Sequence, residues 1–130
     1  MKTKCLKSIL FLIASIYALG NLSQVIAADT TNYTIVIKVS STKPNGDSWD
    51  IGGGAPDIVL EVEDTRYSTT RHSSKRCEDT YKCEMSFSSK NSKWYLEIYD
   101  QDLKIDDLIG KGECQANNTC TLGKATVTIQ

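Results

Sequence analysis

The sequence predicts an all-β protein, an antiparallel β-sandwich of about seven to eight strands with two local disulfides. Three observations predict this fold: apolar and polar residues alternate along several short segments, polar turns separate these segments, and four cysteines follow residue 27. Alternation with a period of two is typical of strands that have one face in the core and one in water. Several such strands with turns between them favour a sandwich over a helical fold.

Five segments show this alternation, and each is rich in β-branched or aromatic residues. They are residues 33–40, 58–63, 83–88, 94–99 and 125–129. The connections between them are polar, for example residues 43–46 and 88–92. The chain has no internal repeat, no linker and no stretch of twelve residues with the apolar spacing of a helix. We therefore expect a single domain.

Residues 1–27 differ from the rest of the chain. They begin with a positively charged segment at residues 1–4, continue with an apolar run at residues 9–19, and end with small or aliphatic side chains at residues 25–27. This pattern is typical of a secretory signal peptide. The apolar run is shorter than the ~20 residues that a membrane-spanning helix needs. We therefore expect the protein to be exported, either secreted or periplasmic, with its folded domain at residues 28–130.

Export makes the cysteines informative. Cys77, Cys83, Cys114 and Cys120 follow the signal peptide, and four cysteines in an exported domain of this size predict two disulfides. Three pairings are possible. Both close spacings can form locally, and a hairpin turn between Cys114 and Cys120 would place these two cysteines opposite each other. We favour the pairs Cys77–Cys83 and Cys114–Cys120 over a zinc site, because structural zinc ligands are usually spaced more closely.

The side chains of the predicted domain argue against nucleic-acid binding and against nucleophilic catalysis. Residues 28–130 carry 12 basic and 16 acidic side chains, since the first 27 residues contain three lysines and no acid. An acidic balance argues against nucleic-acid binding through a basic face. His72 is the only histidine, and the cysteines are expected to be paired, so no Ser-His-Asp triad or Cys-His pair is indicated. We expect that the protein is not an enzyme.

Four aspartates lie within eight residues directly after the segment at 94–99. They are Asp100, Asp102, Asp106 and Asp107. Crowded carboxylates repel one another, so such a loop is either fully solvated or holds a cation, and this segment alone leaves both alternatives open. Closely spaced oxygen ligands suit Ca²⁺, which takes 6–8 oxygens. An EF-hand is excluded, because a loop counted from Asp100 lacks the glycine at position 6 and the glutamate at position 12.

A second acidic loop, at residues 47–57, joins the first two predicted strands. It contains Asp47, Asp50 and Asp57 and three consecutive glycines at residues 52–54. Glycines would let the backbone fold closely around an ion. A phosphate-binding loop would open a helix, whereas this loop precedes a strand. The two loops together favour a Ca²⁺ site.

The two loops resemble those of the C2 domain family, the calcium-dependent membrane-targeting β-sandwiches. The family's first loop has the form D-x-x-G-x-S-D-P-Y before a strand, and here residues 50–57 have the sequence D-I-G-G-G-A-P-D. The second family loop has D-x-D followed by D-x-I-G, and here D-Q-D stands at residues 100–102 and D-L-I-G at residues 107–110. Carried over by motif, the resemblance implies five calcium-ligating aspartates: Asp50, Asp57, Asp100, Asp102 and Asp107.

The spacings within both loops differ from the family pattern by one residue. Asp50 and Asp57 lie one residue further apart than usual, and Asp102 and Asp107 about one residue closer, so Asp47 or Asp106 can replace a neighbour as ligand. The resemblance also implies apolar side chains at the loop tips that enter the headgroup region of a membrane. The candidates are Trp49, Ile51, Leu103 and Ile105. The alternative is that Trp49 and Ile105 fold inward as caps on the sandwich.

We therefore expect a secreted or periplasmic calcium-binding C2-like module that docks on phospholipid headgroups through its Ca²⁺ loops. The alternative is a secreted protein- or glycan-binding sandwich, of the effector or inhibitor type, in which Ca²⁺ and the disulfides are only structural. Extracellular calcium modules work with dissociation constants of ~10⁻⁴–10⁻³ M, so an exported site would be loaded most of the time.

Overall fold

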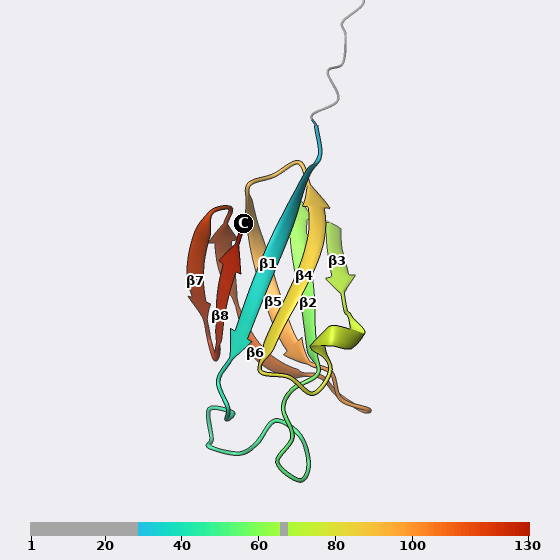
Figure 1. The fold of residues 1–130 in the computed structure, drawn as a ribbon, viewed down its shortest axis with the longest axis vertical. Helices are drawn as coiled ribbons and strands as arrows, with labels where there is room; N and C mark the ends of the chain where they lie inside the picture. Colours follow the sequence, from blue (N-terminus) through green and yellow to red (C-terminus); the bar gives the residue numbers. More distant parts are fainter. Residues whose placement is uncertain (1–28, 66–67) are drawn as a thin grey trace, which may run out of the picture.

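The computed structural model describes residues 29–65 and 68–130 (Figure 1). The predicted signal peptide, residues 1–27, lies outside the described residues. The described part consists of strands and one short 3₁₀ helix, which confirms the all-β prediction. The elements are β1 (Thr31–Val39), β2 (Ile58–Thr65), β3 (Ser68–His72), η1 (Lys75–Cys77), β4 (Lys82–Ser89), β5 (Lys93–Asp100), β6 (Asp107–Gln115), β7 (Asn118–Leu122) and β8 (Ala125–Ile129).

The strands form two four-stranded sheets, so the number of strands also agrees with the prediction. One sheet has the order β4-β1-β8-β7 and the other the order β3-β2-β5-β6. All the strand pairs are antiparallel. No helix among the described residues is long and apolar enough to cross a membrane.

The alternation in the sequence decides which side chains form the core. Along β4 and β5 every second residue is buried and the residues between are exposed or half-buried. Trp94 of β5 lies in an aromatic group with Phe87 and Tyr33, with ring centroids 5.1 Å and 4.7 Å away. Edge-to-face pairs of this kind add to the stabilisation that comes from the buried apolar area.

Three strands carry no clear alternation, and the sequence does not predict them as strands. They are β3, β6 and β7. β3 is exposed along most of its length, so its residues are not selected for an apolar face. β6 contains Gly110, which is explained by packing: a Cβ there would lie 1.8 Å from the carbonyl oxygen of Leu122. The backbone N–H of Lys124 donates to the carbonyl of Ile109 at 3.0 Å, which ties the β7–β8 turn to β6.

Both predicted disulfides are confirmed. Cys77–Cys83 joins η1 to β4, and Cys114–Cys120 joins β6 to β7. The predicted hairpin between Cys114 and Cys120 is wrong in one respect. β6 and β7 belong to different sheets, so the turn at Asn117, which has a φ of 57°, carries the chain from one sheet to the other. This disulfide therefore connects the two layers of the sandwich.

Three connections meet at one end of the sandwich (Figure 1). They are the β1–β2 loop at residues 40–57, the β3–β4 connection at residues 73–81 and the β5–β6 loop at residues 101–106. The two acidic loops are therefore neighbours in space, although residues 58–100 separate them in the chain. Strand order explains this, because β2 pairs with β5 and the end of β5 pairs with the start of β6.

Candidate metal centre

The site is built around Asp100, the last residue of β5. Trp94, Leu96 and Ile98 face the core, and the strand alternation places Asp100 on the same face, where it is 0% exposed. Its Oδ1 accepts a hydrogen bond of 2.8 Å from the backbone N–H of Asp57. Its Oδ2 is buried and has no hydrogen-bond partner among the described residues. Because an unsatisfied buried carboxylate oxygen destabilises a fold, this oxygen is suited to hold a cation.

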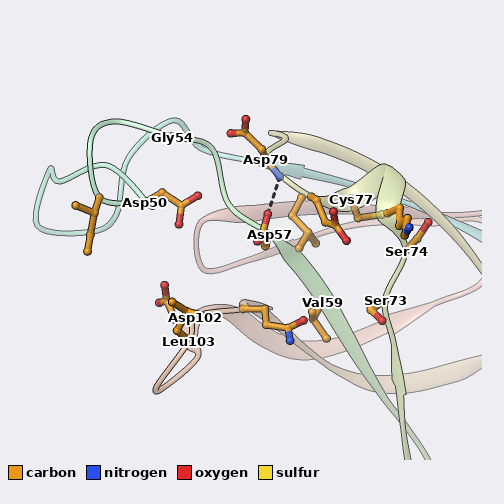
Figure 2. A pocket seen from close by; sticks show the side chains of 15 residues that line it. Asp50, Gly54, Asp57, Val59, Ser73, Ser74, Cys77, Asp79, Asp102 and Leu103 are labelled. Atoms are coloured by element: carbon orange, nitrogen blue, oxygen red, sulfur yellow. Dashed lines mark hydrogen bonds between the residues drawn. The ribbon is translucent and has the colours of Figure 1, made fainter.

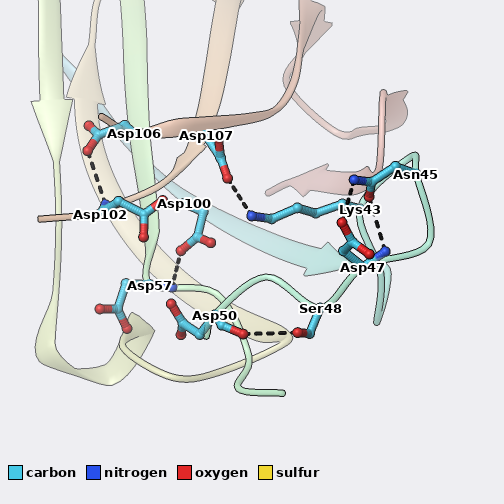
Figure 3. Close-up of polar contacts among 10 residues, drawn as sticks. All are labelled: Lys43, Asn45, Asp47, Ser48, Asp50, Asp57, Asp100, Asp102, Asp106 and Asp107. Carbon is cyan, nitrogen blue, oxygen red and sulfur yellow. Dashed lines mark hydrogen bonds and ion pairs between the residues drawn. The ribbon is translucent and has the colours of Figure 1, made fainter. Parts of the chain in front are cut away.

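Two further carboxylates lie beside it. One carboxylate oxygen from each of Asp50, Asp100 and Asp102 lies within 4.8 Å of the other two (Figure 3). Asp50 comes from the β1–β2 loop, whereas Asp102 follows β5 directly. The two acidic loops thus converge on one point, and three hard oxygen ligands surround it.

The local backbone of the β1–β2 loop holds Asp50 in place. The carbonyl of Asp50 accepts hydrogen bonds from Ser48 Oγ at 2.9 Å and from the backbone N–H of Gly53 at 3.2 Å. Gly52 and Gly53 have φ values of 95° and 97°, which favour glycine over residues with a Cβ. A Cβ at Gly54 would lie 2.9 Å from Cβ of Asp50. The glycines therefore let the loop turn tightly behind the carboxylate.

Burial and the neighbouring acids raise the pKa of two carboxyl groups in this cluster, Asp100 and Asp50. Burial and, to a smaller extent, the neighbouring carboxylates of Asp50 and Asp102 raise the pKa of Asp100, the Asp57 N–H and Lys43 oppose the rise, and the net result is a pKa of about 6. The pKa of Asp50 is also raised, first by burial and then by Asp57 and other acids. A divalent cation would reverse both effects, because it favours the ionised form of each carboxylate.

Asp57 lies next to this group and is held by the third connection. Its Oδ1 accepts a hydrogen bond of 2.7 Å from the backbone N–H of Asp79 (Figure 2). Asp79 Oδ1 in turn accepts one of 3.0 Å from the N–H of Ala55. Both aspartates line a cleft of about 880 Å³ that also borders Asp50 and Asp102. Asp79 is not among the residues predicted from the sequence. The signal was the Cys77–Cys83 spacing, because a short disulfide loop holds the intervening residues close together.

The remaining predicted ligand, Asp107, forms a different contact. Its Oδ2 pairs with Lys43 Nζ at 2.5 Å (Figure 3). Thus the structure brings Asp50, Asp100 and Asp102 together and places Asp57 beside them. Asp107 instead pairs with a lysine of the β1–β2 loop. Lys43 was not predictable as a partner of Asp107, because the two residues are 64 positions apart in the chain.

The two possible substitute ligands also have partners. Asp106 Oδ1 accepts a hydrogen bond of 3.2 Å from the backbone N–H of Asp102, and its Oδ2 pairs with Arg71 at 2.6 Å. Asp47 Oδ2 accepts a hydrogen bond of 2.6 Å from the side chain of Asn45. Both residues therefore shape the loops that carry the three-carboxylate group.

The loop tips divide into exposed and buried side chains. Ile51 and Leu103 are fully exposed, and Ile105 is 80% exposed. Trp49, by contrast, is 3% exposed and its Nε1 donates to the carbonyl of Ser40 at 2.7 Å. Of the two alternatives for these side chains, the structure shows the inward cap for Trp49, whereas Ile105 is exposed and does not form a cap.

No family model matches the sequence, and no curated protein is significantly similar to it. The assignment of the site therefore depends on the arrangement of its carboxylates. The three acids offer only oxygen ligands, one of them buried and without a partner among the described residues, and this set fits Ca²⁺.

Proposed function

We propose that this protein is an exported calcium-binding module that docks on phospholipid headgroups through its two acidic loops. The observation that carries the proposal is the buried Asp100 Oδ2, which has no partner among the described residues and lies in a group with the carboxylates of Asp50 and Asp102. A solvated acidic loop would not bury one of its carboxylates.

The ligand set favours calcium with open coordination positions. Ca²⁺ takes 6–8 oxygens at 2.3–2.6 Å, and three carboxylates supply at most six even when all are bidentate. Even this maximum reaches only the lower end of that range, and Asp100 Oδ1 also accepts the N–H of Asp57, which disfavours bidentate binding by Asp100. Water or the oxygens of a docked molecule would complete the coordination. A phosphate group of a lipid headgroup supplies such oxygens.

The exposed apolar tips favour a membrane as that partner. Ile51 lines the cleft beside Asp50, and Leu103 lines it beside Asp102. Fully burying one such aliphatic side chain contributes about 1.5–3 kcal/mol. A cation that neutralises the aspartates would let these side chains approach an anionic surface. The resemblance of the loops to the C2 family supports the same conclusion.

Export is part of the proposal. Two disulfides indicate an oxidising compartment, and the predicted signal peptide at residues 1–27 would direct the chain there. In such a compartment calcium is abundant, so membrane docking would be constitutive.

Co-sedimentation with vesicles tests the proposal. We expect the protein to pellet with vesicles of phosphatidylcholine and phosphatidylserine in calcium and to remain in the supernatant in EDTA. Leu103→Ser/Ile105→Ser should keep calcium binding and lose at least tenfold in vesicle affinity, because it removes apolar area without removing a carboxylate. Glu113→Gln, on β6 near the opposite end of the sandwich, is the control and should behave like the wild type.

Two results would contradict membrane docking. One is equal pelleting in calcium and in EDTA. The other is a protein that is saturated with calcium and still fails to pellet. The second result would favour the protein- or glycan-binding alternative, in which the ion only stabilises the loops.

A further inference from the structure

Lys43 lies at the edge of the three-carboxylate group, and its position is set by the surrounding loop. Its backbone N–H donates to the carbonyl of Asp47 at 2.8 Å, and its own carbonyl accepts the N–H of Gly46 at 3.0 Å. Its ammonium group lies 5.8 Å from the ring centroid of the buried Trp49. The turn and the indole therefore direct the ammonium group toward the second acidic loop.

The ammonium group already serves the acids as a cation. It pairs with Asp107 at 2.5 Å, and the lysine side chain is 22% exposed, less than the 46% of its partner. Its charge also acts on Asp50 and Asp100, whose ionised forms it favours. One positive charge of the chain itself thus offsets part of the negative charge that converges at this end of the sandwich.

We propose that Lys43 is a tethered cation that takes the place of a second metal ion. It keeps Asp107 out of the ligand set, so that the site holds one divalent cation on Asp50, Asp100 and Asp102. This inference rests on the proposed calcium binding and assigns to Lys43 the control of ion number and affinity. A fixed positive charge repels an incoming divalent ion, and it binds the carboxylate that a second ion would need.

Calcium titration by calorimetry tests this role on protein purified from expression of the full chain with both disulfides formed. We expect the wild type to bind one ion. Lys43→Met should bind two, the first at least tenfold more tightly, because the repelling charge is gone and Asp107 is released. Lys43→Arg keeps the charge and should resemble the wild type. Lys90→Met makes the same change in net charge on the β4–β5 connection at the opposite end (Figure 1) and should also resemble it.

The proposal is overturned if wild type and Lys43→Met bind the same number of ions with the same affinity. A wild type that binds no calcium while Lys43→Met binds it would also overturn the proposal as stated, since Lys43 would then exclude calcium instead of limiting the site to one ion.

If no variant binds calcium, the proposed function fails, and unfolding in EDTA decides the role of Lys43 separately. We then expect Lys43→Met to lower the urea midpoint, and Asp107→Asn to restore part of the loss only when Lys43 is absent. Additive effects of the two substitutions would show that Lys43 is not a counter-cation.

Discussion

Asp100 is the last residue of β5, and its carboxylate is buried in an environment that disfavours charge. Strand alternation places it on the core face after Trp94, Leu96 and Ile98, a face on which an ionised carboxylate is costly. One of its oxygens is satisfied by the N–H of Asp57, and the other has no partner among the described residues. The side chain therefore destabilises the metal-free fold and is poised to bind a cation.

The raised pKa of Asp100 predicts how stability depends on pH in EDTA. Its pKa is about 6 in the folded protein against 3.8 ordinarily, so the native state holds the proton more tightly than the unfolded state. Its contribution to stability is fully present below about pH 4 and is lost as pH rises through 6. Two pKa units correspond to about 2–3 kcal/mol. Asp100→Asn should remove this pH dependence and be more stable than the wild type at pH 7 by a similar amount.

Urea unfolding of both proteins in EDTA between pH 4 and pH 7 measures this difference. The comparison isolates the part of the pH dependence that comes from the Asp100 carboxylate, including its repulsion by Asp50 and Asp102. A constant difference across this pH range would contradict the account. Calcium should abolish the advantage of Asp100→Asn at pH 7, since binding to the native state stabilises only the wild type.

At the scale of elements, the site depends on how three connections are held together. Asp79 of the β3–β4 connection binds both Asp57 and the N–H of Ala55. In the strand that follows the β5–β6 loop, Gly110 lets the β7–β8 turn lie against β6. The glycine of the D-x-I-G motif therefore has a packing role in this protein, separate from any ion.

Gly110→Ala should consequently destabilise the fold strongly. The new Cβ would lie 1.8 Å from the backbone oxygen of Leu122, and neither backbone can shift without breaking the contact between Lys124 and Ile109. We expect a loss of about 3 kcal/mol or more. Gly46→Ala is the control: its φ is 91° but nothing lies within 4 Å of the new Cβ, so about 1 kcal/mol should be lost. Thermal unfolding of the two variants compares their stabilities. Equal losses of stability for Gly110→Ala and Gly46→Ala would contradict the packing role of Gly110.

The sequence predicted the elements whose residues alternate and missed the others for physical reasons. The five alternating segments correspond to β1, β2, β4, β5 and β8. β3 lies at a sheet edge with little apolar burial, and the glycines of β6 interrupt its pattern. Both disulfides were predictable from spacing, but the change of sheet between β6 and β7 was not, because a turn sequence does not show which strand pairs with which.

The candidate site was predictable in part. The three converging aspartates stand in recognisable motifs, and continuing the alternation of β5 by one step would also have predicted that Asp100 is buried. The contacts of Lys43 and Asp79 join residues far apart in the chain, and no local pattern contains them. The inward position of Trp49 was likewise undecided, because a loop tryptophan is compatible with a cap or with an exposed tip.

At the scale of the whole molecule, the two disulfides lie at opposite ends of the sandwich. Cys77–Cys83 closes the connection that carries Asp79, next to the carboxylates. Cys114–Cys120 joins the two sheets near the start of β5, where Cys114 is opposite Trp94. Cys77–Cys83 thus supports the carboxylate site, and Cys114–Cys120 supports the packing of the two sheets.

Removing each disulfide should separate these two roles. Cys114→Ala/Cys120→Ala should lower the free energy of unfolding by about 2 kcal/mol, as expected for a short closed loop, and leave calcium affinity within twofold. Cys77→Ala/Cys83→Ala should also destabilise the fold and weaken calcium binding at least fivefold, because Asp79 is no longer held at Asp57. Calorimetry and urea unfolding of both variants check this. The account is wrong if calcium affinity falls equally in the two.

The central claim is that the two acidic loops form one cation site, and a calorimetric calcium titration tests it most directly. The wild type is compared with Asp100→Asn/Asp102→Asn, and Glu113→Gln is the control for the loss of a charge. We expect the wild type and the control to bind calcium with a dissociation constant of ~10⁻⁴–10⁻³ M, and the double variant to show no binding while remaining folded by circular dichroism. A folded wild type that binds no calcium at millimolar concentration, or a double variant that binds like the wild type, would contradict the claim.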